Sequence, residues 1–209
     1  MKLVLISDTH GFECPVPDGD VLIHAGDLTM SGTVTQISQA AYWLNGLPHK
    51  HKIVIAGNHD WLFERKPEKA ISLLGPNITY LQDQQTIING VKFWGTPVQP
   101  RFYDWAFNVD RGEPIRRYWG MIPKDVDVLI THGPPRGILD QANAVLNTEH
   151  CGCDDLLTAL NWFHPKIHVF GHIHGGYGKQ EVMGGIVCYN ASIVNEAYKP
   201  VNAPWVVEL

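Results

Sequence analysis

The sequence predicts an α/β fold in which two mixed β-sheets pack as a sandwich and helices cover both outer faces. Three observations indicate this architecture. Five short runs are continuously apolar and rich in β-branched residues, which is typical of strands buried on both faces. Segments with helical periodicity lie between some of these runs. Two dipeptides, Asn89-Gly90 and Gly184-Gly185, mark β-hairpins that a purely parallel sheet would not need.

The five predicted core strands are bounded by Gly, Pro, Asp or Asn. They cover Lys2 to Ser7, Asp20 to His24, Lys52 to Ala56, Asp127 to Thr131 and Lys166 to Phe170. The hairpins add four further strands, which cover residues 85–88, 91–94, 180–183 and 186–189.

Three segments are predicted to be helices. In the first, Val34, Ile37, Ala41 and Leu44 recur at helical spacing, and Thr33 with Gln36 resembles a capping box. The second covers residues 67–74, with a proline at its start and Gly75 at its end. The third covers residues 154–163 and is stopped by Pro165.

Length and composition favour one compact domain, residues 1–209, without linker or internal repeat. The chain has 209 residues, of which 44% are hydrophobic, 18% charged and 10% aromatic, all near the averages of globular proteins. The net charge of -5 provides no basic field, so we expect no binding of extended nucleic acid. The oligomeric state stays open.

The sequence also indicates a cytoplasmic protein without membrane attachment. Its opening apolar run, Leu3 to Ile6, is far shorter than the core of a signal peptide, and no run reaches the length of a membrane span. Four cysteines occur, and their spacing matches no structural zinc site, so we interpret Cys151-Gly-Cys153 beside His150 as ordinary reduced thiols.

Polar side chains that can bind metals follow each of the five core runs, in the segments ISDTH, HAGD, AGNHD, THGPP and FGHIHGG. Because the carboxyl ends of strands in an α/β sheet converge on one crevice, these side chains can meet. They are Asp8, His10, Asp27, Asn58, His59, His132, His172 and His174.

The chemistry of these ligands indicates a dinuclear centre. Oxygen and imidazole ligands without thiolate suit Mn, Fe or Zn, and we expect two divalent ions, with Mn preferred. Without His59, which is not counted as a ligand, seven ligands remain; they are too many for one ion, so one carboxylate would be shared. In extended backbone, residues two apart point to the same side, so the pair Asp8 and His10 and the pair His172 and His174 can each chelate an ion.

In their order, these blocks resemble the motif set of the calcineurin-like metallophosphoesterase superfamily: Asp-x-His, Gly-Asp, Gly-Asn-His-Asp, His and Gly-His-x-His. The resemblance covers residues 8–174. The segments KIVIAGNHD, LITHGPP, HVFGHIHGGYG and YNAS are most similar to its metallophosphoesterase domain-containing branch, which is associated with phosphodiesterase activity. The family fold implied is a four-layer αββα sandwich.

The resemblance also implies roles for individual residues. Asp8, His10, Asp27 and His174 would hold one ion, and Asp27, Asn58, His132 and His172 the other. His59 would contact the scissile phosphate beside Asn58 and protonate the leaving oxygen as the catalytic acid. Two ions would supply a bridging hydroxide as the nucleophile.

The residues around these blocks carry further expectations. Asp60 either orients His59 or begins a helix. The segment 99–124 is rich in Arg and aromatic residues, most of which we expect to pack a loop onto the core or to form an interface. Arg111 is a candidate substrate contact, with Arg116 or Arg117 as a second. Six other histidines, His24, His49, His51, His150, His164 and His168, are left outside the site, and His24 and His168 are expected to be core residues.

The leading hypothesis is a phosphodiesterase for cyclic nucleotides or other small phosphodiesters. The alternatives are a phosphomonoesterase, since the same centre can attack either ester, and a scaffold that keeps the fold without chemistry. Protein phosphatases of the superfamily extend the second block to Gly-Asp-x-x-Asp-Arg-Gly. Here Leu28, Thr29, Met30 and Ser31 follow Asp27, which argues against that activity.

Overall fold

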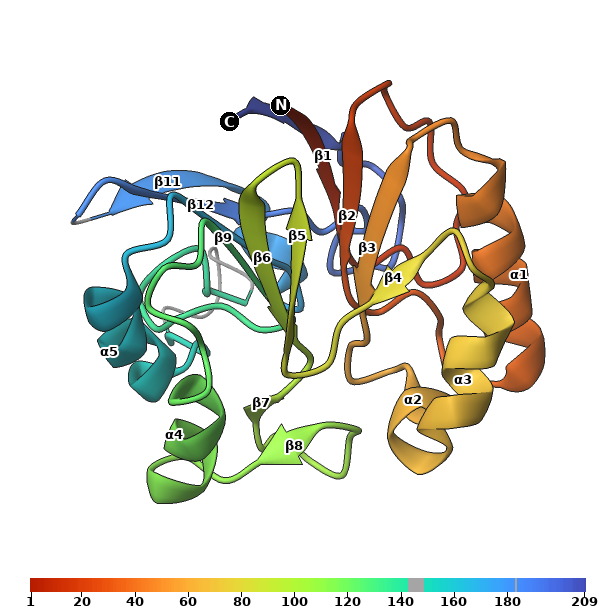
Figure 1. Ribbon diagram of the computed structural model, residues 1–209. Helices are drawn as coiled ribbons and strands as arrows, with labels where there is room; N and C mark the ends of the chain where they lie inside the picture. Colours follow the sequence, from red (N-terminus) through yellow and green to blue (C-terminus); the bar gives the residue numbers. More distant parts are fainter. Residues whose placement is uncertain (143–148, 183) are drawn as a thin grey trace.

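The chain forms two β-sheets that pack face to face, with helices on both outer sides (Figure 1). This is a computed structural model, and it describes residues 1–142, 149–182 and 184–209. The first sheet has the order β13-β1-β2-β3-β4. Its strands are β1 Lys2–Ile6, β2 Val21–Ala25, β3 His51–Ile55, β4 Thr79–Tyr80 and β13 Trp205–Glu208. Strands β1 to β4 are parallel, and β13 is antiparallel to β1.

The second sheet has the order β11-β12-β10-β9-β6-β5. Its strands are β5 Gln84–Ile88, β6 Val91–Thr96, β9 Val128–Thr131, β10 Ile167–Phe170, β11 Gly178–Val182 and β12 Ile186–Asn190. The four inner strands are parallel, and each edge strand is antiparallel to its neighbour. Two short strands, β7 Gln99–Pro100 and β8 Asn108–Val109, pair separately. Both large sheets are therefore mixed, as predicted.

The helices lie on opposite sides of the sandwich (Figure 1). Beside the first sheet are α1 Val34–Gly46, α2 Trp61–Arg65 and α3 Pro67–Leu74; beside the second are α4 Glu113–Trp119 and α5 Asp154–Phe163. Strand β1 shows why the predicted strands are apolar throughout. Leu3 and Leu5 pack between the two sheets, whereas Val4 and Ile6 pack under the helices. A third apolar cluster joins the second sheet to α4 and α5, so the four-layer prediction is confirmed.

The elements match the sequence-based predictions closely. The five core strands appear within one residue of their predicted ends, α3 and α5 begin and end where expected, and α1 contains the predicted helical stripe. The Thr33 side chain and that of Gln36 form the reciprocal capping box of α1. Both hairpins are present, although Met183, which was assigned to the second one, lies outside the described residues. The short elements α2, α4, β4, β7, β8 and β13 were not predicted.

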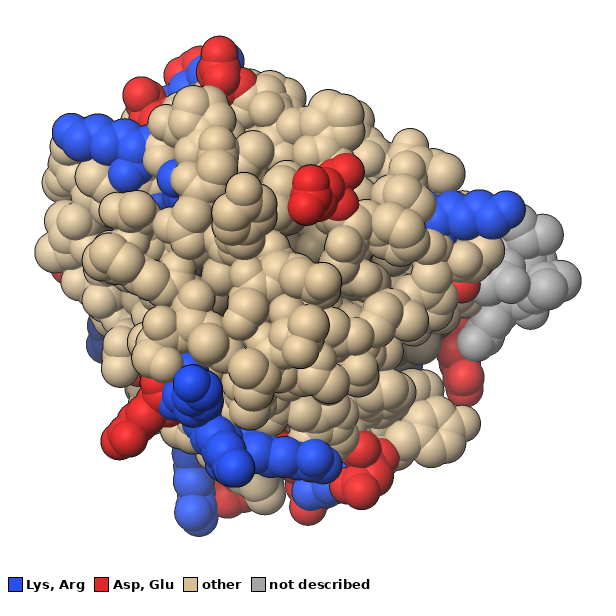
Figure 2. Space-filling view, turned by 90° about the vertical axis from the view of Figure 1, so that its right-hand side faces the viewer, with Lys and Arg blue, Asp and Glu red and all other residues tan. Residues whose placement is uncertain are grey.

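The face formed by α1 and α3 carries few charges (Figure 2). Lys and Arg side chains lie mainly at its edges, where they are mixed with Asp and Glu, and α1 itself contributes no charged side chain. Across the described part of the chain, no helix is long and apolar enough to cross a membrane. On this face, the described residues form no extended basic surface of the kind that binds nucleic acid.

Candidate metal centre

The loops that follow β1, β2, β3, β9 and β10 meet at one end of the sandwich. The first two are tied together by backbone hydrogen bonds from Asp8 to Gly26 (2.9 Å) and from His10 to Asp27 (3.0 Å). The backbone N–H of His59 donates to Asp27 Oδ1 at 2.8 Å, and that of His172 donates to Asp8 Oδ2 at 3.0 Å. All eight side chains singled out by the sequence blocks are therefore brought into one region.

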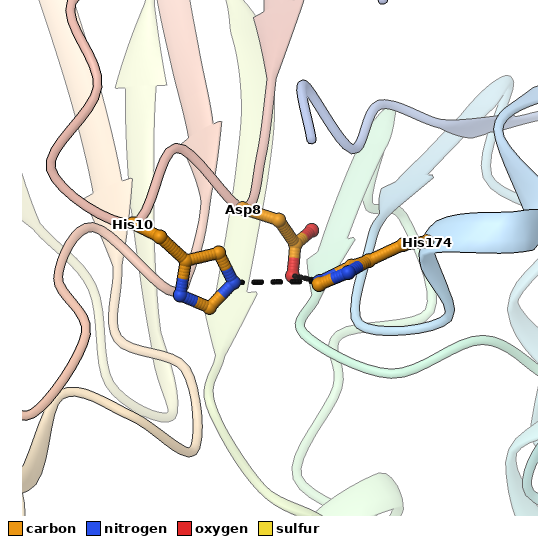
Figure 3. Close-up of side chains that lie close together, drawn as sticks. All are labelled: Asp8, His10 and His174. Carbon is orange, nitrogen blue, oxygen red and sulfur yellow. Dashed lines mark hydrogen bonds and ion pairs between the residues drawn. The ribbon is translucent and has the colours of Figure 1, made fainter. Parts of the chain in front are cut away.

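One group of possible ligands consists of Asp8, His10 and His174, which Figure 3 shows pointing toward one another. The Nε2 atoms of His10 and His174 are 3.4 Å apart, and Nε2 of His174 lies 3.3 Å from Asp8 Oδ1. Asp27 approaches the same group, since its Oδ2 lies 3.7 Å from His10 Nε2. Asp8 comes from the first sheet and His174 from the second.

A second group consists of Asp27, His132 and His172. Asp27 Oδ2 lies 3.4 Å from His132 Nε2, and the same nitrogen lies 2.9 Å from the amide oxygen of Asn58. In each group the ligand atoms lie within 4.8 Å of one another. These oxygen and nitrogen donors suit divalent first-row metal ions. Asp27 also belongs to a third group, with His10 and His59, whose possible ligand atoms lie within the same distance of one another.

Burial and neighbouring charges set the protonation of these side chains. Burial alone would raise the pKa of Asp8, but His174 and the other histidines outweigh it and hold that pKa well below its usual range. Burial lowers the pKa of His172 to about 3, so its imidazole is neutral. Burial also disfavours charged His132, yet Asp27 raises its pKa to about 9. A bound cation would take the place of that proton.

Two glycines let the ligand loops approach one another. A Cβ atom at Gly171 would lie 1.9 Å from Asp8 Oδ2, and one at Gly57 would lie 2.2 Å from Asp27 Oδ1. Neither distance is compatible with a side chain. The glycines next to the ligands are therefore required by the close packing of the loops.

Asp60 stands at the start of α2, as the second of the two expectations has it, but its side chain is used elsewhere. Its carboxylate is fully buried and accepts hydrogen bonds from the backbone N–H groups of Gly57 (2.9 Å), Leu28 (3.0 Å) and Thr29 (3.0 Å), and from the Thr29 hydroxyl (2.8 Å). It precedes α2 without capping it. Asp60 therefore ties the Asp27 loop to the Asn58 loop, because it binds the backbone on both sides.

The ring of His59 is oriented by other groups. Its Nδ1 lies 2.7 Å from the carbonyl oxygen of Met30, which can only accept, so Nδ1 carries a proton and Nε2 is the available nitrogen. Trp105 packs on the ring with centroids 4.3 Å apart, and Tyr198 lies 6.3 Å away. Tyr198 also contacts the rings of His10 and His174 at 4.9 and 5.1 Å.

Sequence reasoning missed the buried side chains that support Asp8. The Ser192 hydroxyl donates to Asp8 Oδ2 at 2.9 Å, and Asn190 donates to the Ile173 carbonyl at 2.8 Å. Asn190 Oδ1 also accepts from the Ser192 backbone at 3.2 Å. Both residues belong to the YNAS segment, which in the sequence carries only the family resemblance.

A cavity of about 870 Å³ opens at the metal centre. Its lining includes Asp27, Asn58, His59, His172 and His174, together with the exposed rings of Phe102 and Tyr103. Most aromatics of segment 99–124 are expected to pack a loop onto the core or to form an interface. Phe107 and Trp119 are buried in the core, whereas Phe102 and Tyr103 are exposed.

Of the three arginines considered as substrate contacts, Arg111 lines this cavity. Its guanidinium donates to the carbonyl oxygens of Gly152 (2.9 Å) and Cys151 (3.2 Å). Arg116 and Arg117 instead pair with Glu113 on the surface of α4. Arg111 is therefore engaged with the protein as well as facing the cavity.

The two histidines that are expected to be core residues, His24 and His168, lie in the core. His24 and His168 are fully buried, and their Nε2 atoms each lie 2.9 Å from a threonine hydroxyl, that of Thr9 and that of Thr131. His24 also supports the loop that carries Asp8 and His10, because Thr9 lies between them.

The sandwich of two mixed sheets brings Asp, Asn and His side chains together at its strand ends, and such ligands can hold the metal ions that phosphoester hydrolases use. The family model of calcineurin-like phosphoesterases matches residues 1–176. The chain belongs to the calcineurin-like phosphoesterase family.

Known relatives agree with this assignment. Human metallophosphoesterase domain-containing protein 1 is 41% identical over 234 residues, an alignment that covers 100% of this chain and 71% of the relative. UPF0046 protein K07C11.7 of Caenorhabditis elegans is 39% identical over 193 residues, covering 85% of this chain and 65% of the relative.

Solved structures show the same fold at low identity. TT1561 of Thermus thermophilus superposes with a TM-score of 0.61 at 14% identity, covering 99% of this chain and 98% of that one. A structure titled as a putative 5'-nucleotidase from Staphylococcus aureus gives a TM-score of 0.53 at 12% identity, covering 99% of this chain and 53% of that one.

Proposed function

We propose that the protein is a phosphodiesterase that cleaves cyclic nucleotides or other small phosphodiesters at a dinuclear metal centre. The observation that carries the proposal is the position of Asp27. Asp27 belongs to two of the possible ligand groups, one that includes His10 and one that includes His132 and His172. It lines the cavity together with His59. A centre shared in this way is the arrangement that two-metal phosphoester hydrolysis requires.

Each side chain has a defined task in this proposal. Asp8, His10, Asp27 and His174 would hold one ion, and Asp27, Asn58, His132 and His172 the other, with Mn as the proposed metal. When bound, two such ions polarise phosphoryl oxygens and supply a hydroxide nucleophile near neutral pH. Because the Met30 carbonyl engages Nδ1–H of His59, the general acid would be the doubly protonated ring, whose Nε2 gives its proton to the leaving oxygen while Nδ1 keeps its own.

The cavity also supports a substrate larger than phosphate. The exposed rings of Phe102 and Tyr103 line it, as do Trp105 and Tyr198. Aromatic side chains bind planar groups by stacking, with ring centroids about 4.5–7 Å apart. A nucleotide or another ester with an aromatic substituent fits this wall, while Asn58 and His59 would contact the phosphoryl group.

The test compares wild type with His59→Ala after chelator treatment and addition of Mn. We expect hydrolysis of bis(p-nitrophenyl) phosphate to return with the metal and to fall about 100- to 10,000-fold in the variant. A strong preference for p-nitrophenyl phosphate would establish a phosphomonoesterase instead. Absence of metal-dependent turnover of either ester would contradict the proposal.

We also propose that residues 1–209 act as one domain in the cytoplasm. The two sheets share the apolar layer between them, which includes residues from β1 and from β10. All four cysteines are free thiols, which fits a reducing compartment.

A further inference from the structure

A histidine that is not part of the ligand groups lies on the wall of the same cavity. Nδ1 of His150 is 2.7 Å from Oδ1 of Asp140, and the His150 side chain, 41% exposed, lines the cavity. Asp140 is 1% exposed. A buried carboxylate thus holds one edge of a ring whose other edge is accessible to a ligand.

The carboxylate is fixed from its other side as well. Asp140 Oδ2 accepts hydrogen bonds from the backbone N–H groups of Gly137 (2.9 Å) and Gly152 (3.0 Å). Because an ionised carboxylate can only accept, the proton of the short bond lies on Nδ1 of His150. The other ring nitrogen, Nε2, points away from Asp140 and has no hydrogen-bond partner among the described residues.

Arg111 braces the segment that carries this histidine. Its two terminal nitrogens donate to the carbonyl oxygens of Gly152 and Cys151, and one lies 3.5 Å from Asp154 Oδ2. The guanidinium is therefore used to hold the backbone just after His150. This contact pattern favours a supporting role for Arg111. The ring of His150, by contrast, presents Nε2 to the cavity.

We infer that His150 is a substrate-contacting residue, whose Nε2 forms a hydrogen bond with a hydroxyl group on the ester substituent. Asp140 and Arg111 are its positioning residues. The inference rests on the proposed function, since it assigns His150 to the substrate of that site. Because His150 belongs to none of the ligand groups that include Asp27, the inference assigns it to the substituent and not to the reacting phosphoryl group.

Two substitutions of His150 distinguish the role of Nδ1 from the role of Nε2. In His150→Asn the amide reaches only as far as Nδ1, so the bond to Asp140 can remain while the hydrogen-bonding atom in the cavity is lost. In His150→Gln the amide reaches the position of Nε2. His164, an exposed histidine at the end of α5 that does not line the cavity, provides the matched control His164→Asn.

The probes are the p-nitrophenyl ester of thymidine 5'-phosphate, which carries a sugar hydroxyl, and bis(p-nitrophenyl) phosphate, which carries none. With the Mn-loaded full chain, we expect the ratio of kcat/KM for the first ester to that for the second to fall about three- to tenfold in His150→Asn, through KM. His150→Gln should recover part of the ratio. An unchanged ratio in His150→Asn, or an equal fall in His164→Asn, would overturn the inference.

A binding measurement decides the inference independently of turnover. Calorimetry on the Mn-loaded protein compares thymidine 5'-phosphate with inorganic phosphate, and the ratio of their affinities should fall by the same factor in His150→Asn. If wild type hydrolyses neither ester, the proposed function fails, and the affinity ratio still tests His150. If wild type is active and both ratios are unchanged, only the role of His150 fails.

Discussion

Four of the seven proposed metal ligands have left-handed backbone conformations: Asp8, His10, Asp27 and His172, with φ between 47 and 66°. Such conformations are unfavourable for side chains with a Cβ and persist only where surrounding contacts impose them. Here the contacts are identifiable, because Asp8 and His10 donate backbone hydrogen bonds to the next ligand loop. The sharp turns aim the side chains at one point, so local backbone strain accompanies the construction of the site.

At the residue scale, Ser192→Ala is expected to weaken metal binding without unfolding the protein. The hydroxyl holds Asp8 Oδ2, and losing a group that orients a metal ligand costs about 10- to 100-fold in affinity. Titration of the chelator-treated protein with Mn by calorimetry measures the change. Ser72→Ala, at an exposed site on α3, is the control. Equal affinities in the two variants would show that Ser192 does not support the ligand.

A second residue-scale prediction concerns His168 and acid stability. Burial lowers its pKa to about 3, so the folded protein keeps it neutral while the unfolded chain takes up a proton below about pH 6.5. The unfolding free energy that depends on a neutral His168 is therefore fully present above pH 6.5 and is lost as the pH falls toward 3.

Urea unfolding of wild type and His168→Gln at pH 7 and pH 5 tests this prediction. Glutamine can keep the bond to Thr131 but cannot be protonated. Wild type should lose about 2 kcal/mol more unfolding free energy than the variant over this interval. The surface variant His164→Gln should follow wild type. Parallel loss in all three proteins would mean that His168 does not titrate as expected.

At the scale of elements, the strength of a local signal decided which elements could be predicted. Helix α1 combines a four-position apolar stripe with a capping box, and both are visible in the sequence. Helices α2 and α4 have five and seven residues, and neither has a side-chain cap. Such short helices depend on tertiary packing, because isolated segments of this length are not stable in water.

The capping box gives a prediction for α1. Thr33→Ala removes the side-chain acceptor for the N–H of Gln36 at 3.3 Å and should lower the unfolding free energy by about 1 kcal/mol. Thr35→Ala changes the same residue type at an exposed position inside the helix and should be neutral or slightly stabilising. Thermal and urea unfolding of the two variants provide the comparison. Equal stabilities would mean that the cap does not contribute.

At the scale of the whole molecule, the candidate metal centre joins the two halves of the sandwich. Asp8, Asp27 and Asn58 follow strands of the first sheet, whereas His132, His172 and His174 follow strands of the second (Figure 1). The sheets otherwise meet through the apolar layer between them. An ion held from both sides would therefore oppose their separation.

Metal removal should lower the thermal stability of the protein. An ion present at 100 times its dissociation constant stabilises the folded state by about 2.7 kcal/mol, which corresponds to roughly 5–10 °C for a chain of this size. Calorimetric scans with chelator and then with added Mn measure the shift. Asp27→Asn should abolish most of it, and Asp18→Asn, at an exposed position, should retain it. A shift that survives in Asp27→Asn would place the stabilising ion elsewhere.

The sequence by itself determined the class of fold and the types of ligand. Burial on both faces makes the core strands apolar throughout, and hairpin and cap signals act over a few residues, so all are visible locally. The ligands were visible because chemistry restricts them to few residue types, and because each comes directly after a strand. This is why Asp8, Asp27 and His132 could be named without coordinates.

Only the tertiary structure decided how the site is supported and lined. Ser192 reaches Asp8 across 184 positions of sequence, and Arg111 braces a segment 41 residues away. Asp60 binds the backbone of two loops, and the pairing of His150 with Asp140 turned a histidine set aside at first into a group facing the cavity. None of these contacts leaves a local pattern, because each depends on where distant loops come together once the two sheets have packed.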